Sequence, residues 1–339
     1  MKYRFWGERL SRRQLLARGG ALAAAGAASL AAPGAGAAGG PHHGQLHSGG
    51  LDHGGNLVVG DVDLSLFDPT AYLTRFDYGK VSTLPDGRTL REYKLVASDK
   101  EIEVAPGVKF AAWTYNDQVP GPTLRCTEGD RLRIHFINGG SHPHTIHFHG
   151  IHAANMDGVF EQVAPGAEFT YEFDAEPFGL QLYHCHTPPL RRHIHKGLYG
   201  VFIIDPPEPR PPALELVMTM NGFDTNFDGE NEVYAVNTVA FHYVRHPIRL
   251  RVGELVRIYL VNMTEFDPVN SLHTHANFFR EYRTGTSLTP NNLTDITVLG
   301  QAERAILELT YKFPGTYMFH AHQTEFSELG WTGMFEVLS

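Results

Sequence analysis

A repeat within the chain limits the possible folds more than any other feature of the sequence. Residues 121–138 are followed by His144-Thr-Ile-His-Phe-His149, and residues 247–262 are followed by Asn270-Ser-Leu-His-Thr-His275. Both stretches alternate apolar and polar residues, which is the period of a β-strand, and each leads to a His-x-His pair. A repeat period above 100 residues indicates duplication of a whole domain rather than a solenoid.

The second half of each copy also matches. Residues 169–173 lead to Tyr183-His-Cys-His186, and residues 306–310 lead to Phe319-His-Ala-His322. Between the copies, residues 206–212 are rich in proline and cannot pair into a sheet, so they predict a stiff linker. Short alternating strands, Gly/Pro turns and the absence of a long amphipathic pattern predict two antiparallel β-sandwiches, at 88–205 and 213–339.

The N-terminus resembles an export signal. Arg12 and Arg13 precede an apolar stretch over residues 19–32, and Ala35-Gly-Ala37 offers a small-residue cleavage site. This pattern predicts a twin-arginine signal over residues 1–37 and therefore a periplasmic or secreted protein without a membrane anchor. Residues 38–87 begin with histidines among Gly, Ser and Pro, and we expect them to form a flexible N-terminal segment.

The charge of the chain argues against nucleic acid as a partner. The formal net charge is −9, although the first 37 residues carry six basic side chains and one glutamate. The remaining body is therefore more acidic than the whole chain and repels phosphate backbones. Hydrophobic residues make up 42% of the sequence, which is typical of globular domains with sizeable cores.

Histidine is the residue type that points to chemistry, because the chain has 20 histidines and two cysteines. On a strand, residues i and i+2 share a face, so each His-x-His pair presents two imidazoles side by side. Eight such histidines exceed what one zinc ion needs, whereas imidazole also suits copper, and a Cys/His₂ set marks a blue-copper centre. The pairs are His147/His149, His184/His186, His273/His275 and His320/His322.

Strand parity separates a second set of ligands from these pairs. Cys185 lies between His184 and His186 and therefore faces the opposite way, and His144 points away from the His147 face for the same reason. The loop over 187–198 offers His193 or His195 as a third ligand. A disulfide to Cys126 would destroy this arrangement, so we expect Cys126 to be an inert core residue.

These motifs resemble those of the multicopper oxidases, and more narrowly the bacterial two-domain laccase-like enzymes, over residues 91–339. The resemblance implies two cupredoxin-like Greek-key β-sandwich domains and four coppers per chain. His147 and His273 would bind the type 2 copper, and the other six paired histidines would bind the two type 3 coppers. The type 1 copper would take His144, Cys185 and His193, with Leu198 at the axial position and Met156 as a second axial candidate.

The second domain departs from this pattern because Asn270 replaces His144 and Ala321 replaces Cys185. The resemblance therefore implies a type 1 site in the first domain only. The expected function is oxidation of phenolic or similar small reducing substrates coupled to reduction of dioxygen to water. A copper nitrite reductase also resembles this chain but needs only three histidines at its catalytic copper, and a copper-binding electron-transfer protein is a further alternative.

Two more expectations follow from the resemblance. Reduction of dioxygen needs protons, and Asp157 matches the acidic position of the family, although Asp157-Gly158 is also a turn sequence. Glu325 and Glu328, which follow His322, are further candidates. Two-domain laccases and nitrite reductases are head-to-tail homotrimers, so we expect clusters at the interfaces between subunits.

Overall fold

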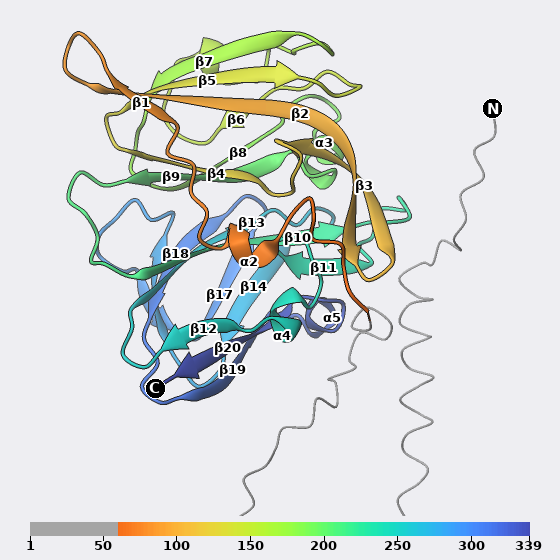
Figure 1. Cartoon of the computed structure of the whole chain (residues 1–339), viewed down its shortest axis with the longest axis vertical. Coiled ribbons are helices and arrows are strands. Elements are labelled where there is room, and N and C mark those ends of the chain that lie inside the picture. Colours follow the sequence, from red (N-terminus) through yellow and green to blue (C-terminus); the bar gives the residue numbers. More distant parts are fainter. Residues whose placement is uncertain (1–59) are drawn as a thin grey trace, which may run out of the picture.

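The computed structural model describes residues 60–339, so the predicted signal over 1–37 and residues 38–59 lie outside the described part. The described residues form two β-sandwiches stacked one above the other in Figure 1. The prediction of two β-sandwich domains is confirmed. None of the helices in residues 60–339 is long and apolar enough to cross a membrane.

The first domain packs two sheets against each other. One sheet has the order β1-β2-β5-β7, with β3 also paired to β2, and the other has the order β4-β9-β8-β6. The elements are α2 (Pro69–Tyr72), β1 (Lys80–Thr83), β2 (Thr89–Ala105), β3 (Val108–Tyr115), β4 (Gly121–Thr127), β5 (Arg131–Asn138), β6 (His147–Phe148), η2 (Ala154–Met156), β7 (Glu168–Asp174), β8 (Gly179–His184), α3 (Leu190–His195) and β9 (Tyr199–Asp205).

The second domain repeats the sandwich with sheets of order β11-β10-β13-β18-β15-β16 and β12-β20-β19-β14-β17. Its elements are β10 (Leu214–Phe223), β11 (Val233–Val236), α4 (His242–Arg245), β12 (Ile248–Arg251), β13 (Val256–Asn262), β14 (Val269–Thr274), β15 (Phe279–Arg283), β16 (Asn292–Thr294), β17 (Ile296–Gly300), β18 (Arg304–Leu309), β19 (Gly315–His320), α5 (Thr324–Glu328) and β20 (Thr332–Leu338).

The sheets are mixed, so the expectation of purely antiparallel sheets was wrong. In the first domain β2 pairs with β5 in parallel, and so does β4 with β9. The second domain has parallel pairs between β10 and β13 and between β12 and β20. The chain visits the opposite sheet between such partners, and these long crossovers allow parallel pairing. Alternation of apolar and polar residues is the same in both kinds of strand, so the sequence pattern could not separate them.

Residues 60–87 depart from the flexible segment expected there. Asp68 caps α2, and Tyr72 and Leu73 are buried in the core. The backbone N–H of Val217 in β10 donates to the carbonyl of Leu73, while Asp77 forms a bridge with Leu124 in β4. Burial of these apolar side chains therefore holds this part of the segment across both domains.

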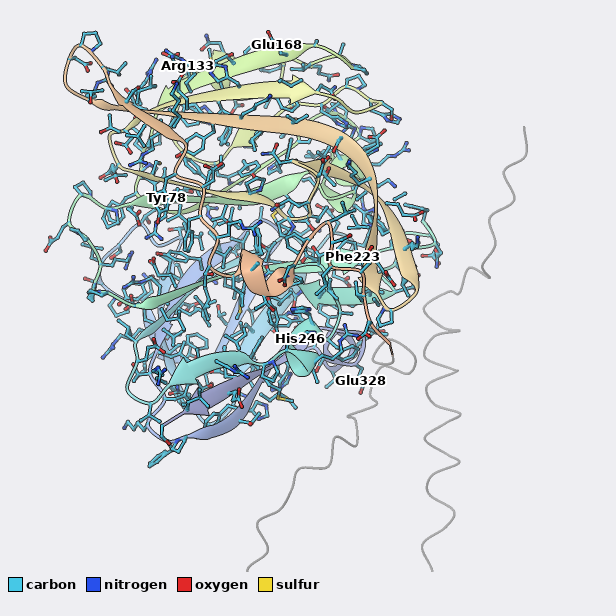
Figure 2. All side chains as sticks on the ribbon, in the orientation of Figure 1. Tyr78, Arg133, Glu168, Phe223, His246 and Glu328 are labelled. Carbon is cyan, nitrogen blue, oxygen red and sulfur yellow. The ribbon has the colours of Figure 1, made fainter. Side chains whose placement is uncertain are left out.

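A hairpin also joins the domains. In Figure 1, β2 runs along the first domain and then bends with β3 toward the second. Val104 and Phe110 of this hairpin belong to the same buried cluster as Met220 and Phe223 of β10. Phe223 lies within the body of the molecule in Figure 2, whereas Arg133 and Glu168 lie on the outer sheet. One apolar core therefore continues from the hairpin into the second domain.

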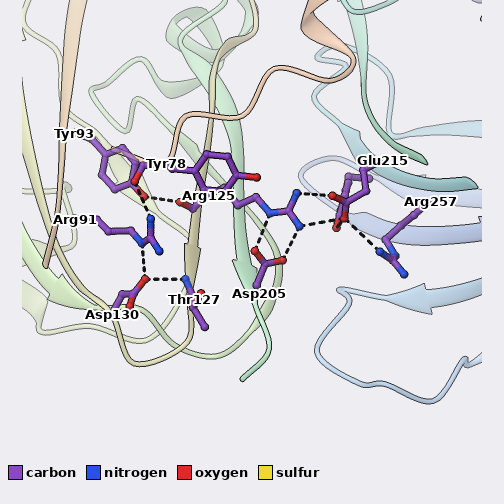
Figure 3. Close-up of polar contacts among 10 residues, drawn as sticks. Tyr78, Arg91, Tyr93, Arg125, Thr127, Asp130, Asp205, Glu215 and Arg257 are labelled. Carbon is purple, nitrogen blue, oxygen red and sulfur yellow. Dashed lines mark hydrogen bonds and ion pairs between the residues drawn. The ribbon is translucent and has the colours of Figure 1, made fainter. Parts of the chain in front are cut away.

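Ion pairs complete the contact between the domains, as Figure 3 shows. The guanidinium of Arg125 in β4 contacts Asp205 (2.7 Å) and Glu215 of the second domain (2.7 Å). Glu215 also contacts Arg257, which pairs with Glu308. Burial acts to lower the pKa of Arg125, but the hydrogen bonds to Asp205 and Glu215 outweigh it and raise that pKa. The charges therefore satisfy one another inside the interface.

We expect Arg125→Leu to destabilise the protein by roughly 3 kcal/mol, because Asp205 would keep its charge without a partner and Glu215 would keep only Arg257 as a charged partner. The matched control is Arg249→Gln, which breaks an exposed pair with Glu336 and should cost less than about 1 kcal/mol. Denaturant unfolding of both variants measures the difference. Equal stability of the two variants would show that the Arg125 network does not stabilise the fold.

Candidate metal centres

Three buried side chains of the first domain converge on one point, and we call them the type 1 group: His144, Cys185 and His193. His144 lies in a short bridge with Val163, Cys185 follows β8 directly, and His193 lies on α3. The His193 Nδ1 is 3.3 Å from the Cys185 Sγ and 3.2 Å from the His144 Nδ1, and the His144 Nδ1 is 3.9 Å from the same sulfur.

The type 1 group fits a trigonal metal ion. With bonds of about 2.0 Å to nitrogen and 2.3 Å to sulfur, such an ion holds its nitrogens about 3.5 Å apart and about 3.7 Å from the sulfur. The observed distances of 3.2, 3.3 and 3.9 Å lie around these values. Burial lowers the pKa of His144 and of His193 to about 4, so both imidazoles are neutral at neutral pH and free to bind a metal.

The surroundings of Cys185 favour a bound cation. Burial raises the pKa of the Cys185 thiol, while hydrogen bonds from Thr145 and Thr187 act in the opposite direction. The backbone N–H of Thr145 donates to the Cys185 Sγ over 3.4 Å. A thiolate in this apolar site therefore requires a metal ion to compensate its charge.

The structure separates the candidates that the sequence left open. His195 is turned away from the type 1 group, because its Nε2 accepts the backbone N–H of Asp224 (3.0 Å). Leu198 is fully buried in the same core as Cys185, whose backbone N–H donates to the Leu198 carbonyl (2.9 Å). The Met156 sulfur instead accepts the backbone N–H of Glu172 in β7 (3.3 Å). Of the two axial candidates, Leu198 is therefore the one that the loop over 187–198 places beside Cys185.

Four histidines of the first domain form what we call half-site 1. His147 in β6 lies opposite His184 in β8, and the Nε2 atoms of His149 and His184 are 3.2 Å apart. The His147 and His186 rings lie 5.4 Å apart. Burial lowers the pKa of His149 to about 3 and that of His184 to about 4, so these two rings are neutral.

Half-site 2 repeats this arrangement in the second domain with His273, His275, His320 and His322. His273 in β14 lies opposite His320 in β19, and the Nε2 atoms of His275 and His320 are 3.0 Å apart. The His273 and His322 rings lie 5.3 Å apart. His275 and His322 are exposed, so this half-site opens to the surface of the chain.

Backbone carbonyls orient the rings in the same way in both half-sites. The Nδ1–H of His147 donates to the Asp157 carbonyl (2.8 Å), and that of His184 donates to the Cys185 carbonyl (3.0 Å). The matching bonds run from His273 to Asp295 (2.9 Å) and from His320 to the Ala321 carbonyl (2.6 Å). With Nδ1 occupied, each ring presents Nε2 as its metal ligand.

Comparison with known proteins now gives the family. Models of multicopper oxidases match residues 97–209 and 209–339, which contain both half-sites and the type 1 group. The chain belongs to the multicopper oxidase family. A crystal structure of a multicopper oxidase is 58% identical and superposes with a TM-score of 0.79 over 80% of this chain and 97% of that chain. The cupredoxin-like fold expected from the sequence is confirmed.

Copper nitrite reductases are also similar to this multicopper oxidase. The enzyme of Nitrosomonas europaea is 26% identical, with a TM-score of 0.67 over 74% of this chain and 94% of that chain. The copper-containing nitrite reductase of Neisseria meningitidis is 28% identical over 250 residues, which are 68% of this chain. The match spans 64% of the length of that curated relative.

The second domain of this multicopper oxidase has a filled counterpart of the type 1 group. The Cys185 N–H donates to Leu198 in the first domain, and the Ala321 N–H donates to Trp331 in the second (3.1 Å). The Trp331 N–H donates in turn to the Phe326 carbonyl, as Leu198 does to His193. The indole N–H of Trp331 bonds to the Asn270 Oδ1 (3.0 Å). Asn270, Ala321, Phe326 and Trp331 of the second domain therefore stand where the first domain has His144, Cys185, His193 and Leu198.

The three acidic residues predicted as proton donors, Asp157, Glu325 and Glu328, differ in their position in the fold and in their exposure. The Asp157 Oδ1 lies 3.1 Å from the His147 Nδ1, behind the ring rather than on its Nε2 side. A Cβ at Gly158 would lie 1.9 Å from the Ile146 carbonyl, and its φ is +71°, so only glycine lets this loop close on β6. Glu325 is half-buried on α5, and Glu328 is exposed. Asp157 thus orients His147 directly.

Three residues that were not predicted from the sequence support the half-sites: Asp295, Thr145 and Ser271. The Asp295 Oδ2 lies 3.7 Å from the His273 Nδ1, in the place that Asp157 takes beside His147. The Thr145 hydroxyl accepts the His186 N–H (3.0 Å), and the Ser271 hydroxyl accepts the His322 N–H (2.8 Å). Thr145 and Ser271 directly follow His144 and Asn270, so position-by-position comparison of the two copies could have found them. Asp295 has no such signal.

We expect Cys185→Ser to abolish the blue absorption of the copper-loaded protein, because that colour arises from a thiolate on copper. Half-site histidines are unchanged in this variant and should still bind copper. Cys126→Ser is the matched control, since Cys126 is buried, unbonded and outside the type 1 group. Visible absorption and metal analysis test both variants. A colourless Cys126→Ser beside a blue Cys185→Ser would reverse the assignment of the thiolate.

Proposed function

We propose that this multicopper oxidase is laccase-like: it oxidises phenolic or similar small reducing substrates one electron at a time and reduces dioxygen to water. The observation that carries this proposal is that both half-sites are complete. Each has four histidines on facing strands with their rings oriented by backbone carbonyls. A nitrite reductase would need only three histidines at its catalytic copper, so the full set favours dioxygen.

In this proposal the residues divide into three copper sites. His144, Cys185 and His193 would hold the type 1 copper, and Leu198 would lie beside them in the same buried core. His147 and His273 would share the type 2 copper, and the type 3 pair would bind to His149, His184, His186, His275, His320 and His322. Bound copper supplies the one-electron chemistry and the activation of dioxygen.

The chain itself contributes the path, the geometry and the protons. Cys185 is covalently adjacent to His184 and His186, so the type 1 group and half-site 1 are joined through the backbone. The buried core around Cys185 excludes water from the type 1 group. Asp157 lies against His147 and is the best placed carboxylate to hold a proton beside half-site 1, and Glu325 is the candidate beside half-site 2.

We further propose that the clusters form between subunits of a homotrimer. Half-site 1 lies on the sheet of β6 and β8, and half-site 2 lies on the sheet of β14 and β19. The other sheet of the second domain, which contains β10 and β18, faces the first domain and lies between these two sheets. Among residues 60–339, no ring contact joins a histidine of one half-site to a histidine of the other. Within one chain the two complete half-sites therefore do not meet to form one cluster.

Exposed apolar side chains beside both half-sites support this assembly. Phe278 is 56% exposed and Phe313 70% exposed, and both line a cavity with His273 and His275. Ile151 and Phe160 are exposed in the segment that follows His149 of half-site 1. Apolar residues gathered at such places favour an interface, and a head-to-tail interface that closes into a ring gives three identical sites. Export by the twin-arginine route to the periplasm or beyond remains part of the proposal.

Copper content and substrate separate the candidate functions. We expect anaerobically reconstituted protein to approach four coppers per chain, because the chain supplies one type 1 group and two half-sites. Oxygen uptake should accompany oxidation of a phenol, with no turnover of nitrite. A plateau at two coppers together with nitrite turnover would instead identify a nitrite reductase. Tight binding of copper without turnover of either acceptor would favour an electron-transfer protein.

Complementation tests the position of the cluster. His147→Ala disables half-site 1 and His320→Ala disables half-site 2, so each homotrimer should be inactive. Random mixing of the refolded chains should restore about a quarter of the interfaces, each made of two intact halves. Oxygen uptake should therefore return in part. If mixed trimers form, as mass measurements can show, and oxygen uptake does not return, the cluster lies within one chain.

A further inference from the structure

The type 1 group is sealed from solvent in this chain. His144 and Cys185 are 0% exposed and His193 is 3% exposed. A reductant in solution therefore cannot touch His144 or Cys185 and has almost no access to His193. Electrons must therefore pass through a residue that lies between the type 1 group and the solvent.

Trp113 in β3 packs against two of these side chains. Its ring centroid lies 4.7 Å from the His193 ring and 5.2 Å from the His144 ring, and the side chain is itself buried. The backbone N–H of Trp113 donates to the Lys196 carbonyl (2.8 Å), which ties β3 to the end of α3. The indole is therefore held in place against two residues of the type 1 group.

Two polar side chains continue from Trp113 to the surface. The ring of His142, which is exposed, has its centroid 4.6 Å from that of Trp113. The Arg192 guanidinium, on an exposed residue of α3, lies 5.2 Å from the indole. His142, Trp113 and His193 thus form a series of rings in contact from the surface to the type 1 group, with a cation beside it.

We propose that Trp113 is the residue through which electrons enter the type 1 centre, from small anionic reductants that dock outside it at His142 and Arg192. This inference rests on the proposed function. With ferrocyanide as the probe, one electron leaves ferrocyanide to give ferricyanide and reduces one type 1 copper ion. No bond forms or breaks and no proton moves. The Arg192 charge attracts the anion, and the tilted rings in contact shorten the gap that the electron crosses.

The test follows bleaching of the blue absorption when ferrocyanide is mixed anaerobically with the full-length, copper-loaded enzyme. Ferrocyanide is too bulky to enter the space that one side chain leaves. We expect Trp113→Leu to slow bleaching about tenfold, and Trp113→Phe, which keeps an aromatic ring, to slow it less than about threefold. The absorption and electron paramagnetic resonance spectra of the oxidised type 1 copper should be unchanged, as should reoxidation of prereduced enzyme by dioxygen.

Phe227→Leu is the matched control, because Phe227 is an exposed aromatic residue on the other side of Lys196 and contacts no residue of the type 1 group. Its rate of bleaching should equal that of the wild type. If Trp113→Leu loses the blue absorption, Trp113→Met takes its place in the comparison. Failure of the proposed function would show differently, as a wild-type protein that bleaches with ferrocyanide but is not reoxidised by dioxygen.

A second measurement needs no bound copper. In the metal-free protein, diethyl pyrocarbonate should label His193 several-fold more in Trp113→Leu than in the wild type, as peptide mass analysis can show. Unchanged labelling would overturn the role of Trp113 as the cover. Bleaching of Trp113→Leu at the wild-type rate or faster would overturn the role in electron entry, because Trp113 would then only shield the site.

Discussion

The alternation of side chains over residues 184–186 is the constraint on which both metal centres depend. His184 and His186 face half-site 1, and Cys185 faces the core of the first domain. A shift of one residue in the pairing of β6 with β8 would reverse all three side chains at once. The register that sets His147 opposite His184 therefore fixes half-site 1 and the type 1 group together. The same register, His273 opposite His320, fixes half-site 2.

This dependence explains which parts of the site could be predicted from the sequence. The period of two along a strand was enough to pair the eight histidines and to send Cys185 and His144 to the opposite side. It could not choose between His193 and His195, because that choice depends on how α3 turns against Phe110 and Phe266. Asp295 reaches His273 from the bend between β16 and β17, 22 residues later in the chain, and no local spacing predicts such a contact. Residues 60–87 were missed for a similar reason, since their order comes from burial against both domains.

The contact between the domains keeps the two half-sites of one chain apart. Arg125, Glu215 and Arg257 hold the facing sheets together through buried charges, and the β2–β3 hairpin adds an apolar core. Stacked sheets lie about 10 Å apart. The sheet of β10 and β18, which lies between the sheets that carry the two half-sites, therefore keeps the histidines of half-site 1 and half-site 2 from meeting. The contact that stabilises one chain thus keeps its two half-sites apart. In the proposed homotrimer, a second chain would bring the missing half without any rearrangement of the domains.

The two domains differ in how the core is stabilised at the position of the type 1 group. In the second domain the Trp331 indole fills the space and satisfies Asn270, so that core is packed and its polar groups are bonded without any metal. In the first domain the corresponding core holds two neutral imidazoles and a thiol, and the His144 Nδ1, His193 Nδ1 and Cys185 Sγ face one another. A buried polar set of this kind costs stability unless a ligand compensates it. A metal ion bound there would therefore contribute to the stability of the first domain at a position where the second domain relies on packing.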